Sequence, residues 1–582
     1  MKYNFLKKRI AELILENLSV DNSAVTIDNV CDDITLCERP ELGDFTFKCF
    51  RLAGILKGSP ANISKDLASR FVNSPFLIEA NAVGPYLNLR VSSTVAMSGL
   101  SAAVVEGQLA HQPKTGRRLI IEHSQPNTHK NLHIGHCRNS VLGDVLVRMF
   151  RFLGNEVIAV NYHGDEGTHV AKCLWYMKNH DLWPEENEDK AAWLGAVYEK
   201  SNSYLESTKG TEKEALVRAS ISGILKELET RQGSYYELWK TTKSWSEDLF
   251  RDLYDWLDVK FDEWSSESEV SEVSLEIVLE YLDKGVFVES DGAVGADLDE
   301  FGLGFCILRK SDGSGLYATK DIALALKRFD EYQPDECIYV VDFRQSHHFK
   351  QIFATLNLMG FEIADQCQHL AYELVETTNG PMSSRKGNII PIRDLILELE
   401  AVASGRFSEK GRPDAPNDSE KSDIARNIAK AAVRYGMIRV EPASKIIFDM
   451  KEWLRLEGNT GPYLLYAHIR MTSILEQFGE KYHELEIQDF HGLQERSETK
   501  LLAVMADYYD RVSESTAKMK PSIFSNYLFD FAKAFSKFYS EVSIYKTEDA
   551  DLRAARISLV ALTLVYFSAG LSILGISPVR KM

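Results

Sequence analysis

The sequence predicts an α/β protein with a Rossmann-type parallel sheet and a helical insertion, preceded by a small α+β domain and followed by an all-α bundle. Apolar strands at 119–122 and 157–162 enclose a helical pattern over 138–153. A strand–helix–strand unit of this length predicts parallel strands joined by a right-handed crossover. The stretch from 170 to 285 is rich in Trp, Glu and Lys and lacks strand alternation. Beyond residue 422 nearly all of the chain follows a helical pattern.

The small α+β domain is expected at residues 1–112. It opens with an amphipathic helix, continues through a helical stretch at 61–71 and contains an alternating strand at 85–91. A polar, Gly-containing segment at 111–118 predicts a linker to the next domain.

The parallel-sheet domain is expected at residues 113–400, with its helical insertion at about 175–285. Strand patterns return at 306–309 and 337–342, and we expect them to complete the parallel sheet. The all-α bundle is expected at 401–582.

Composition is close to the soluble average. The chain has 582 residues, of which 45% are hydrophobic and 26% are charged. These values exclude a disordered or fibrous protein, and the length predicts roughly two to four domains. The formal net charge of −18 argues against nucleic-acid binding, since phosphate contacts come from Lys and Arg. It does not exclude such a partner, because a large acidic protein can still present one basic face.

Eight cysteines are scattered without a Cys-x-x-Cys pair, which argues against a structural zinc site and a redox pair. They predict reduced, packed thiols in a cytoplasmic protein that holds no structural metal. Near the N-terminus, Glu12 and Glu16 follow three basic residues at helical spacing, which interrupts any signal-peptide apolar region. We therefore expect an amphipathic helix there.

The C-terminal region offers one alternative, a membrane anchor. After a polar run at 404–422 that predicts an exposed loop, the segment from Ile557 to Ile576 carries no charged residue and is long enough to span a bilayer. Hydroxyl side chains and glycines dilute its hydrophobicity, and the centre of a large helical bundle requires an equally apolar helix. We expect a buried helix and no membrane association.

Two histidines, His133 and His136, lie at the predicted turn between the first strand and its helix. Pro126 stiffens this turn, and Gly135 allows a nucleotide to approach closely. The helix N-terminus near His136 offers backbone NH groups to phosphate oxygens, and the imidazoles would stabilise charge that develops on an α-phosphate. Taken alone, the pair is better explained by half of a metal site or by two surface histidines.

The segment from Glu122 to His136 resembles the HIGH signature of class I aminoacyl-tRNA synthetases, in the extended form found in arginyl-tRNA synthetases. Asn127 also matches, whereas Gln125 departs from the Ser common in the family, so no role is assigned to it. The positions for which the resemblance implies a catalytic role or contact with ATP are Lys130, His133, Gly135 and His136.

The stretch Met382-Ser-Ser-Arg-Lys-Gly-Asn388 resembles the KMSKS loop of the same class and predicts such a loop at 381–388. A basic loop alone is usually only solvated, but a Lys beside a Gly can offset the charge of a leaving pyrophosphate. Lys386 is expected to act as the second lysine of the signature, with Arg385 as the alternative, and Pro381 replaces the first lysine. The other loop residues expected to contact ATP are Met382, Ser383 and Ser384.

Recognition of a guanidinium requires acceptors in bidentate geometry. Three segments offer them: the end of the first strand, the Leu-Tyr-Ala-Thr-Lys-Asp run at 316–321, and the Asp-Phe-Arg-Gln-Ser-His-His-Phe run at 342–349. Each resembles the arginyl-family segment at the same place. The residues that the resemblance places on the arginine side chain are Glu122, Tyr317, Asp321 and Gln345. Those placed at its α-amino end are Asn127 and Ser124.

Several of these assignments have a structural alternative. Asp321 could instead cap or charge the first turn of its helix, and Glu122 could pair with a nearby Arg. The turn at 164–168 resembles the Gly-Asp-x-Gly-Thr turn of the family, in which Asp165 would contact arginine or simply fix the turn. Glu166 stands where the family often has Trp.

The resemblance covers nearly the whole chain in order. Residues 457–470 and 571–578 resemble the helical anticodon-binding domain, and 42–45 and 84–88 resemble the N-terminal domain that contacts the tRNA elbow. It implies the activity of arginine–tRNA ligases, with ATP and Mg²⁺, L-arginine and tRNA(Arg), in a monomer that activates arginine with tRNA bound. The alternatives are another class I synthetase and a non-catalytic, synthetase-derived tRNA-binding protein.

Overall fold

The computed structural model divides the chain into two compact units, which we call the flanking unit and the sheet unit. The flanking unit comprises Met1–Pro113, Phe152–Gly154 and Arg455–Met582, and the sheet unit comprises Lys114–Arg151 and Asn155–Leu454. Within them, the residues that the structure describes are 5–18, 25–39, 41–71, 74, 76–378, 380–381, 390–405, 417–479 and 492–579.

A five-stranded sheet forms the centre of the sheet unit, and all of its neighbouring strands are parallel. In spatial order the strands are β12 (Cys367–Tyr372), β11 (Glu336–Asp342), β5 (Arg118–Glu122), β6 (Glu156–His163) and β7 (Glu263–Ser266). The chain adds β6 and β7 on one side of β5, and then β11 and β12 on the other. This arrangement confirms the predicted Rossmann-type sheet, and the reversal of strand order predicts a ligand crevice at the carboxyl ends of β5 and β11.

Helix α6 (Ile134–Phe152) connects β5 to β6 and begins earlier than predicted, so that His136 lies in its first turn. Two buried arginine side chains hold this helix in the sheet unit. Arg138 donates to the carbonyl oxygen of Ser444 at 2.8 Å, and Asp144 forms a buried ion pair with Arg434 of α15 (Asp418–Ile438).

Four helices form the insertion between β6 and β7. They are α7 (Thr168–Asn179), α8 (Lys190–Thr208), α9 (Glu212–Glu229) and α10 (Ser234–Leu257). Each contributes to one apolar core, which includes Trp175, Leu194, Ile224 and Trp239. The stretch expected to be helical up to residue 285 also contains β7. This strand escapes sequence patterns because it is a four-residue edge strand, Glu-Trp-Ser-Ser, with a single neighbour in the sheet.

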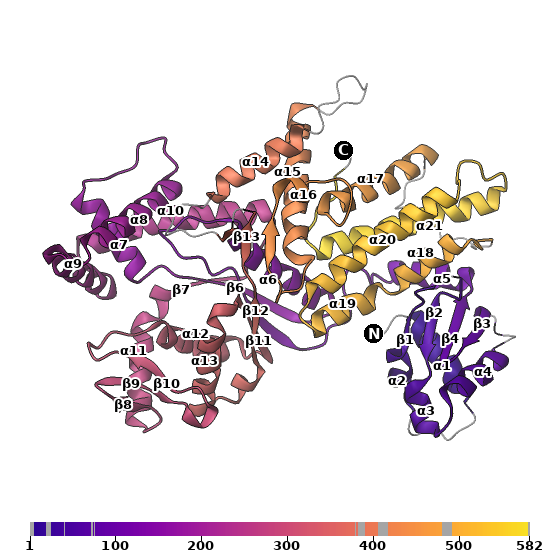
Figure 1. Ribbon diagram of the computed structural model, residues 1–582, viewed down its shortest axis with the longest axis horizontal. Helices are drawn as coiled ribbons and strands as arrows, with labels where there is room; N and C mark the ends of the chain where they lie inside the picture. Colours follow the sequence, from indigo (N-terminus) through magenta and orange to yellow (C-terminus); the bar gives the residue numbers. More distant parts are fainter. Residues whose placement is uncertain are drawn as a thin grey trace. The chain divides into compact units, whose positions relative to one another are not determined.

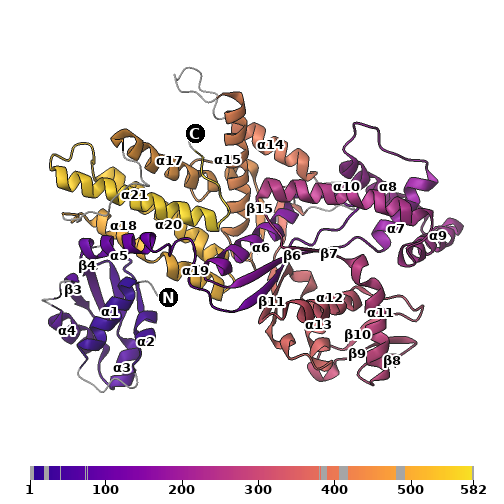
Figure 2. The ribbon, with the colours of Figure 1, turned by 180° about the vertical axis from the view of Figure 1, so that it is seen from behind.

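A second sheet of the same unit is antiparallel, in the order β10 (Phe305–Arg309), β9 (Ala293–Asp297) and β8 (Val288–Ser290). The expectation that the strand at 306–309 completes the parallel sheet was therefore wrong. Gly302 and Gly304 take left-handed φ values of 67° and 68°, which turn the chain back so that β10 pairs with its sequence neighbour β9. Figures 1 and 2 show this sheet beside α11 (Glu267–Asp283), α12 (Tyr317–Tyr332) and α13 (Ser346–Leu358).

After β12, a third small sheet joins β14 (Gly380–Pro381), β13 (Val375–Thr377) and β15 (Ile446–Phe448). Between them lie α14 (Ile392–Gly405) and α15, and α16 (Met450–Trp453) follows. The loop expected at 404–422 ends earlier than predicted, because Asn417 and Glu420 form a capping box at the start of α15. Residues 406–416 of that loop lie outside the described residues.

The N-terminal part of the flanking unit contains an antiparallel sheet in the order β1 (Ile34–Leu36), β2 (Phe45–Lys48), β4 (Tyr86–Val91) and β3 (Leu77–Val83). Its helices are α1 (Phe5–Glu16), α2 (Ile27–Asp32), α3 (Phe50–Leu56), α4 (Pro60–Arg70) and α5 (Ser93–Val105). The predicted opening helix, the helix at 61–71 and the strand at 85–91 are confirmed as α1, α4 and β4.

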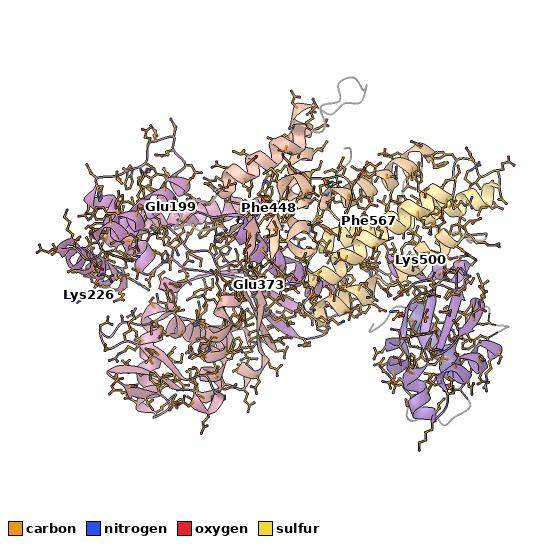
Figure 3. The ribbon with its side chains drawn as sticks, in the orientation of Figure 1. Glu199, Lys226, Glu373, Phe448, Lys500 and Phe567 are labelled. Carbon is orange, nitrogen blue, oxygen red and sulfur yellow. The ribbon has the colours of Figure 1, made fainter. Side chains whose placement is uncertain are left out.

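The C-terminal part of this unit contains α17 (Gly461–Phe478), α18 (Arg496–Ala506), α19 (Tyr508–Ala517), α20 (Pro521–Glu541) and α21 (Ala550–Ile573). Lys500 of α18, labelled in Figure 3, donates to the carbonyl oxygen of Cys37 at 3.1 Å. Helix α21 is long and apolar enough to cross a membrane, yet 67% of its most apolar window is buried. Phe567, also labelled in Figure 3, is fully buried, as expected for the core helix of a bundle.

Candidate active site

Polar side chains gather at the carboxyl ends of four parallel strands of the sheet unit. Strand β5 ends at Glu122, β6 at His163, β7 at Ser266 and β11 at Asp342. Because the carboxyl ends of parallel strands lie along one edge of a sheet, the turns that follow them line the crevice at the reversal of strand order.

The turn after β5 has a strained backbone. Ser124, Gln125 and His129 take left-handed φ values of 77°, 48° and 59°, which are costly for residues other than Gly. Neighbouring hydroxyls hold the turn, because Ser124 Oγ lies 2.7 Å from Tyr254 Oη and His129 Nε2 lies 2.8 Å from Thr242 Oγ1. The hydroxyl of Ser124 is buried and already bonded, so its geometry favours a structural role over the predicted contact with the α-amino group.

His133 and His136 lie against each other at the start of α6, with ring centroids 4.2 Å apart. The backbone NH of Gly135 donates to His133 Nδ1 at 3.1 Å, and that of His133 donates to His136 Nδ1 at 3.1 Å. Burial lowers the pKa of His133 to about 4, and burial with the charges of His133 and Lys130 holds the pKa of His136 well below its usual value. Both rings are therefore neutral at pH 7, and because each Nδ1 accepts a backbone NH, each Nε2 carries the proton and can donate a hydrogen bond.

Lys130 and the start of α14 lie close to this pair. The ammonium of Lys130 lies 5.7 Å from the centre of the Tyr198 ring, and its charge depresses the pKa of the neighbouring His136. The backbone NH of Ile392 donates to the carbonyl oxygen of Leu132 at 3.0 Å, so α14 begins beside the histidine turn. The residues assigned to the KMSKS-like loop lie outside the described residues, and their roles stay predictions. These are Met382, Ser383, Ser384, Arg385 and Lys386.

Glu122 is buried at the end of β5 and already binds an internal guanidinium. Its Oε2 forms an ion pair with Nη1 of Arg328 in α12, and its Oε1 accepts a hydrogen bond from Gln125 Nε2 at 2.8 Å. Burial raises the pKa of Glu122, and the charge of Arg328 opposes this rise. A substrate guanidinium would have to displace Arg328, so the geometry favours the alternative in which Glu122 pairs with a nearby Arg.

Asp321 and Tyr317 lie on α12, at the side of the crevice. Asp321 lies beyond the first turn of the helix and does not cap it. Its Oδ2 lies 2.6 Å from His348 Nε2, and both side chains stay about one quarter exposed, at 23% and 25%. The hydroxyl of Tyr317 lies near Gly167, where an added Cβ would be 3.4 Å away. Gln345 is exposed in the short 3-10 turn between β11 and α13.

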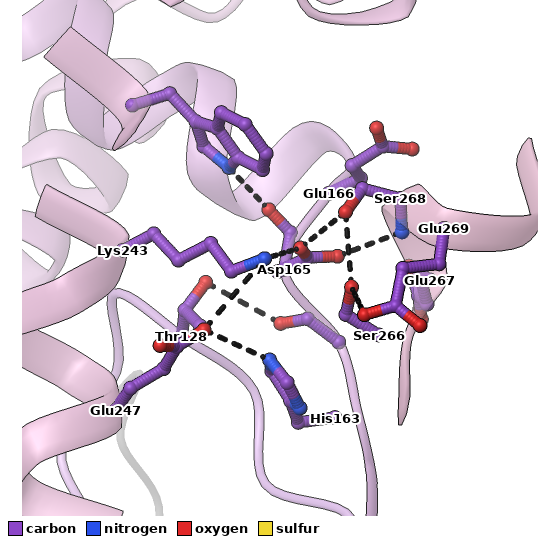
Figure 4. A network of polar contacts seen from close by, with 12 residues as sticks. Thr128, His163, Asp165, Glu166, Lys243, Glu247, Ser266, Glu267, Ser268 and Glu269 are labelled. Carbon is purple, nitrogen blue, oxygen red and sulfur yellow. Dashed lines mark hydrogen bonds and ion pairs between the residues drawn. The ribbon is translucent and has the colours of Figure 1, made fainter. Parts of the chain in front are cut away.

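Asp165 is fully buried in the turn after β6, and its contacts are satisfied within the protein (Figure 4). Its carboxylate accepts hydrogen bonds from Lys243 Nζ at 2.5 Å, Ser268 N at 2.9 Å and Ser268 Oγ at 2.6 Å. Its carbonyl oxygen accepts one from Trp239 Nε1 at 2.7 Å. Burial would raise the pKa of Asp165, but Lys243 and Ser268 outweigh it, so the pKa lies below its usual value. Asp165 therefore fixes the turn, which is the alternative to its predicted contact with arginine.

Glu267 is a carboxylate of the crevice that the sequence reasoning missed. It begins α11 directly after β7, its side chain is 10% exposed, and its Oε2 has no hydrogen-bond partner among the described residues. An added Cβ at Gly164 would lie 3.2 Å from Glu267 Oε1 and 2.5 Å from Asn127 Oδ1, so these three residues share one wall. Burial raises the pKa of Glu267 to about 8, since Lys320 offsets the effect only in part.

The buried side chain of Tyr162 is affected by three acidic side chains of the candidate site. Burial raises the pKa of Tyr162 in β6 well above its usual value, and the charges of Asp321, Glu267 and Glu122 raise it further. Three carboxylates from three different elements thus lie within electrostatic range of one tyrosine of the sheet. A signal for Glu267 was present, since it is an acidic residue directly after a sheet strand, but the polar sequence of β7 concealed that strand.

Three family models match the chain in the predicted order. The class I tRNA synthetase (R) catalytic domain matches residues 99–450. The arginyl-tRNA synthetase N-terminal domain matches 5–91, and the DALR anticodon-binding domain matches 464–582.

Relatives with curated names agree with these matches. The arginine–tRNA ligase of Bdellovibrio bacteriovorus is 40% identical over 551 residues, which cover 94% of this chain and 93% of the relative. That of Clostridium botulinum is 33% identical over 586 residues and covers 99% of this chain and 100% of the relative. The solved arginyl-tRNA synthetase of Thermus thermophilus superposes with a TM-score of 0.80 at 26% identity, over 99% of this chain and 100% of that one. The chain therefore belongs to the arginine–tRNA ligases, a family of class I aminoacyl-tRNA synthetases.

Proposed function

We propose that this enzyme activates L-arginine with ATP and transfers the arginyl group from the adenylate to the 3′ end of tRNA(Arg). The observation that supports it best is the arrangement of Asp321 and Glu267 in the crevice that begins at the His133–His136 turn. One end of that crevice carries neutral donors and a helix N-terminus suited to phosphate, and the other carries acceptors suited to a cation.

The carboxylates of Asp321 and Glu267 explain why the amino-acid substrate would be arginine. Asp321 is partly exposed and Glu267 lacks a hydrogen-bond partner at Oε2 among the described residues, so both have capacity for a planar donor. A ligand without a guanidinium would leave these acceptors desolvated and unpaired, which costs binding free energy. Tyr317 and Asn127, and Gln345 by resemblance, would complete the contacts to the side chain and the α-amino group.

The reaction follows from positioning and phosphate stabilisation. A carboxylate oxygen of arginine attacks the α-phosphorus of ATP, the bond to the bridging oxygen breaks, and pyrophosphate leaves with its Mg²⁺. His133 and His136 donate hydrogen bonds to the phosphate, and we assign Lys386, with Arg385 as the alternative, to the leaving pyrophosphate. A terminal ribose hydroxyl of the tRNA then attacks the arginyl carbonyl carbon, and AMP leaves.

The proposal extends to the rest of the chain. With the chain divided into 1–112, 113–400 and 401–582, we assign the first part to the tRNA elbow and the last to the anticodon. The anticodon-binding domain model, which matches 464–582, supports the second assignment. We further propose a monomeric, cytoplasmic enzyme that does not associate with membranes. Sedimentation of the purified chain and fractionation of cells that produce it test these statements.

Charging of total tRNA with labelled arginine tests the proposed activity. His136→Ala and Asp321→Ala are each expected to lower the charging rate by about 100-fold or more, because each removes a contact to a reacting or recognised group. Asp330→Ala, an exposed residue of the same helix, is the matched control and should charge normally. Normal charging by Asp321→Ala would show that the arginine pocket is misassigned.

Pyrophosphate exchange across the twenty amino acids, with tRNA present, separates the alternatives. Exchange with an amino acid other than arginine would indicate another class I synthetase. Binding of tRNA without exchange or charging would indicate a non-catalytic tRNA-binding protein.

A further inference from the structure

Glu166, the residue after Asp165, lies in a compact group of charges at the wall of the crevice. It is 7% exposed. Asp165, Glu166 and Glu267 lie there with the ammonium groups of Lys243 and Lys320. Figure 4 shows the three carboxylates and Lys243. Carboxylates outnumber these ammonium groups, since Lys243 Nζ also lies 3.6 Å from Glu247 Oε1.

The distances show which of Asp165, Glu166 and Glu267 lacks a hydrogen-bonded ammonium group. Lys243 Nζ lies 2.5 Å from Asp165 Oδ2, and Lys320 Nζ lies 2.8 Å from Glu166 Oε2. From Glu267 Oε2, Lys320 Nζ is 3.8 Å away, which is beyond hydrogen-bond distance. Glu267 is therefore the carboxylate without a hydrogen-bonded ammonium group, although a small shift of Lys320 would bring one to it.

Glu166 is well placed to keep that ammonium from moving. Its Oε2 also accepts a hydrogen bond from Ser271 Oγ at 2.6 Å, which fixes the carboxylate from the side of α11. The same Ser271 hydroxyl lies 3.1 Å from the carbonyl oxygen of Glu267, so the support for Glu166 and the start of α11 belong to one local structure. Lys320 thereby has a short, hydrogen-bonded partner on Glu166 and a longer contact to Glu267.

We propose that Glu166 is a positioning residue for arginine recognition, because it holds the ammonium of Lys320 away from Glu267 and so leaves Glu267 free to accept the substrate guanidinium. This inference rests on the proposed function. It identifies Glu166 as a determinant of arginine affinity that acts through Lys320 and does not touch the substrate itself.

Loss of the Glu166 charge releases Lys320 to pair with Glu267, because Glu267 Oε2 already lies 3.8 Å from its Nζ. An arriving guanidinium must then displace an ammonium group that neutralises its acceptor. Glu166→Gln is expected to raise the KM for arginine by about tenfold or more, with the KM for ATP unchanged, since the histidine turn is not involved.

The double variant Glu166→Gln/Lys320→Met provides the decisive measurement. With the ammonium removed, Glu267 is free again, and the KM for arginine should return to within about twofold of the unaltered enzyme. Lys320→Met alone should leave the KM for arginine no higher than that of the unaltered enzyme. Glu272→Gln, an exposed Glu of α11, is the matched control and should change neither KM.

The steady-state constants for arginine and ATP are measured in the charging assay, and thermal unfolding confirms that each variant is folded. If Glu166→Gln does not fold, Glu166→Asp replaces it, since it keeps the charge but shortens its reach, and a smaller rise in the arginine KM is expected. An unchanged arginine KM, or a double variant as impaired as the single one, overturns the inference alone. Failure of the unaltered chain to charge arginine overturns the proposed function and the inference with it.

Discussion

Glu122 and Arg328 form an ion pair in which both side chains are buried, at 5% and 2% exposure. The pair joins the end of β5 to α12 and places an internal guanidinium beside the crevice. A residue that the sequence assigned to substrate recognition is thus neutralised by the protein's own arginine, which is why we propose Asp321 and Glu267 as the acceptors of the substrate guanidinium.

This relationship predicts a stability effect. Arg328→Met is expected to lower the free energy of unfolding by about 3–5 kcal/mol, because it leaves the Glu122 carboxylate buried and unpaired. The double variant Glu122→Gln/Arg328→Met should recover most of that loss, since no isolated charge remains. Denaturant unfolding of the single and double variants measures both values. Equal losses in the two variants would contradict the prediction.

Gly164 predicts a steric effect on arginine binding. In Gly164→Ala the new methyl group would meet Asn127 Oδ1 at 2.5 Å and Glu267 Oε1 at 3.2 Å, so both acceptors must shift away from the ligand. The KM for arginine should rise by about tenfold, which corresponds to a loss of about 1.4 kcal/mol of binding free energy. The control is Gly223→Ala in α9, where an added Cβ meets nothing within 4 Å. It should leave charging kinetics unaltered, and an equal KM in the two variants would refute the steric argument.

The pKa of Glu267 predicts that arginine binding depends on pH. In the empty crevice this pKa is raised to about 8, so the side chain is largely protonated at neutral pH. A guanidinium favours the ionised form, and binding therefore releases a proton. The affinity for arginine should rise with pH, by at most about tenfold per pH unit, and level off above pH 8.

Other charged groups face the same site, and a variant separates their effects. The charges that act on Glu267 are those of Lys320, Asp321, Asp165 and Glu166. Burial would lower the pKa of His348, but the hydrogen bond and charge of Asp321 outweigh it, so this pKa lies above its usual value. Glu267→Gln should bind arginine more weakly and lose the part of the pH dependence that ends near pH 8. Calorimetry in two buffers of different ionisation enthalpy counts the released protons. Identical proton release by the variant would assign the effect to another group.

Lys243 and Lys240 lie on the same helix and provide a matched pair for the Asp165 network. Lys243→Met leaves Asp165 buried without its cation and should lower the free energy of unfolding by about 3–5 kcal/mol. Lys240 pairs with exposed Glu237 and lies 5.1 Å from the centre of the Tyr236 ring, both at the surface, so Lys240→Met should change stability little. Chemical denaturation of both variants measures the difference. A similar small effect in both would mean that the Asp165–Lys243 pair does not hold the turn after β6.

Local sequence patterns predicted β5, β6 and the turn with the two histidines, which form the part of the candidate site assigned to ATP. β5 and β6 are apolar runs, and the two histidines follow the first of them, so their place at a strand–helix turn could be read from chain order. β7 and β10 show where such reading fails. β7 is short and polar at a sheet edge, and β10 has an ordinary strand pattern that does not reveal which neighbour it will pair with.

The sequence by itself determined the family, the order of strands and helices around His133 and His136, and Asp321 as a candidate acceptor for a guanidinium, because these depend on residue type and spacing along the chain. Only the tertiary structure decided which carboxylates remain open. Arg328, Lys243 and Lys320 reach their partners from distant segments, and burial makes each such pairing costly to break. Ionic partnership in a protein interior is set by distances in space, which residue spacing does not specify.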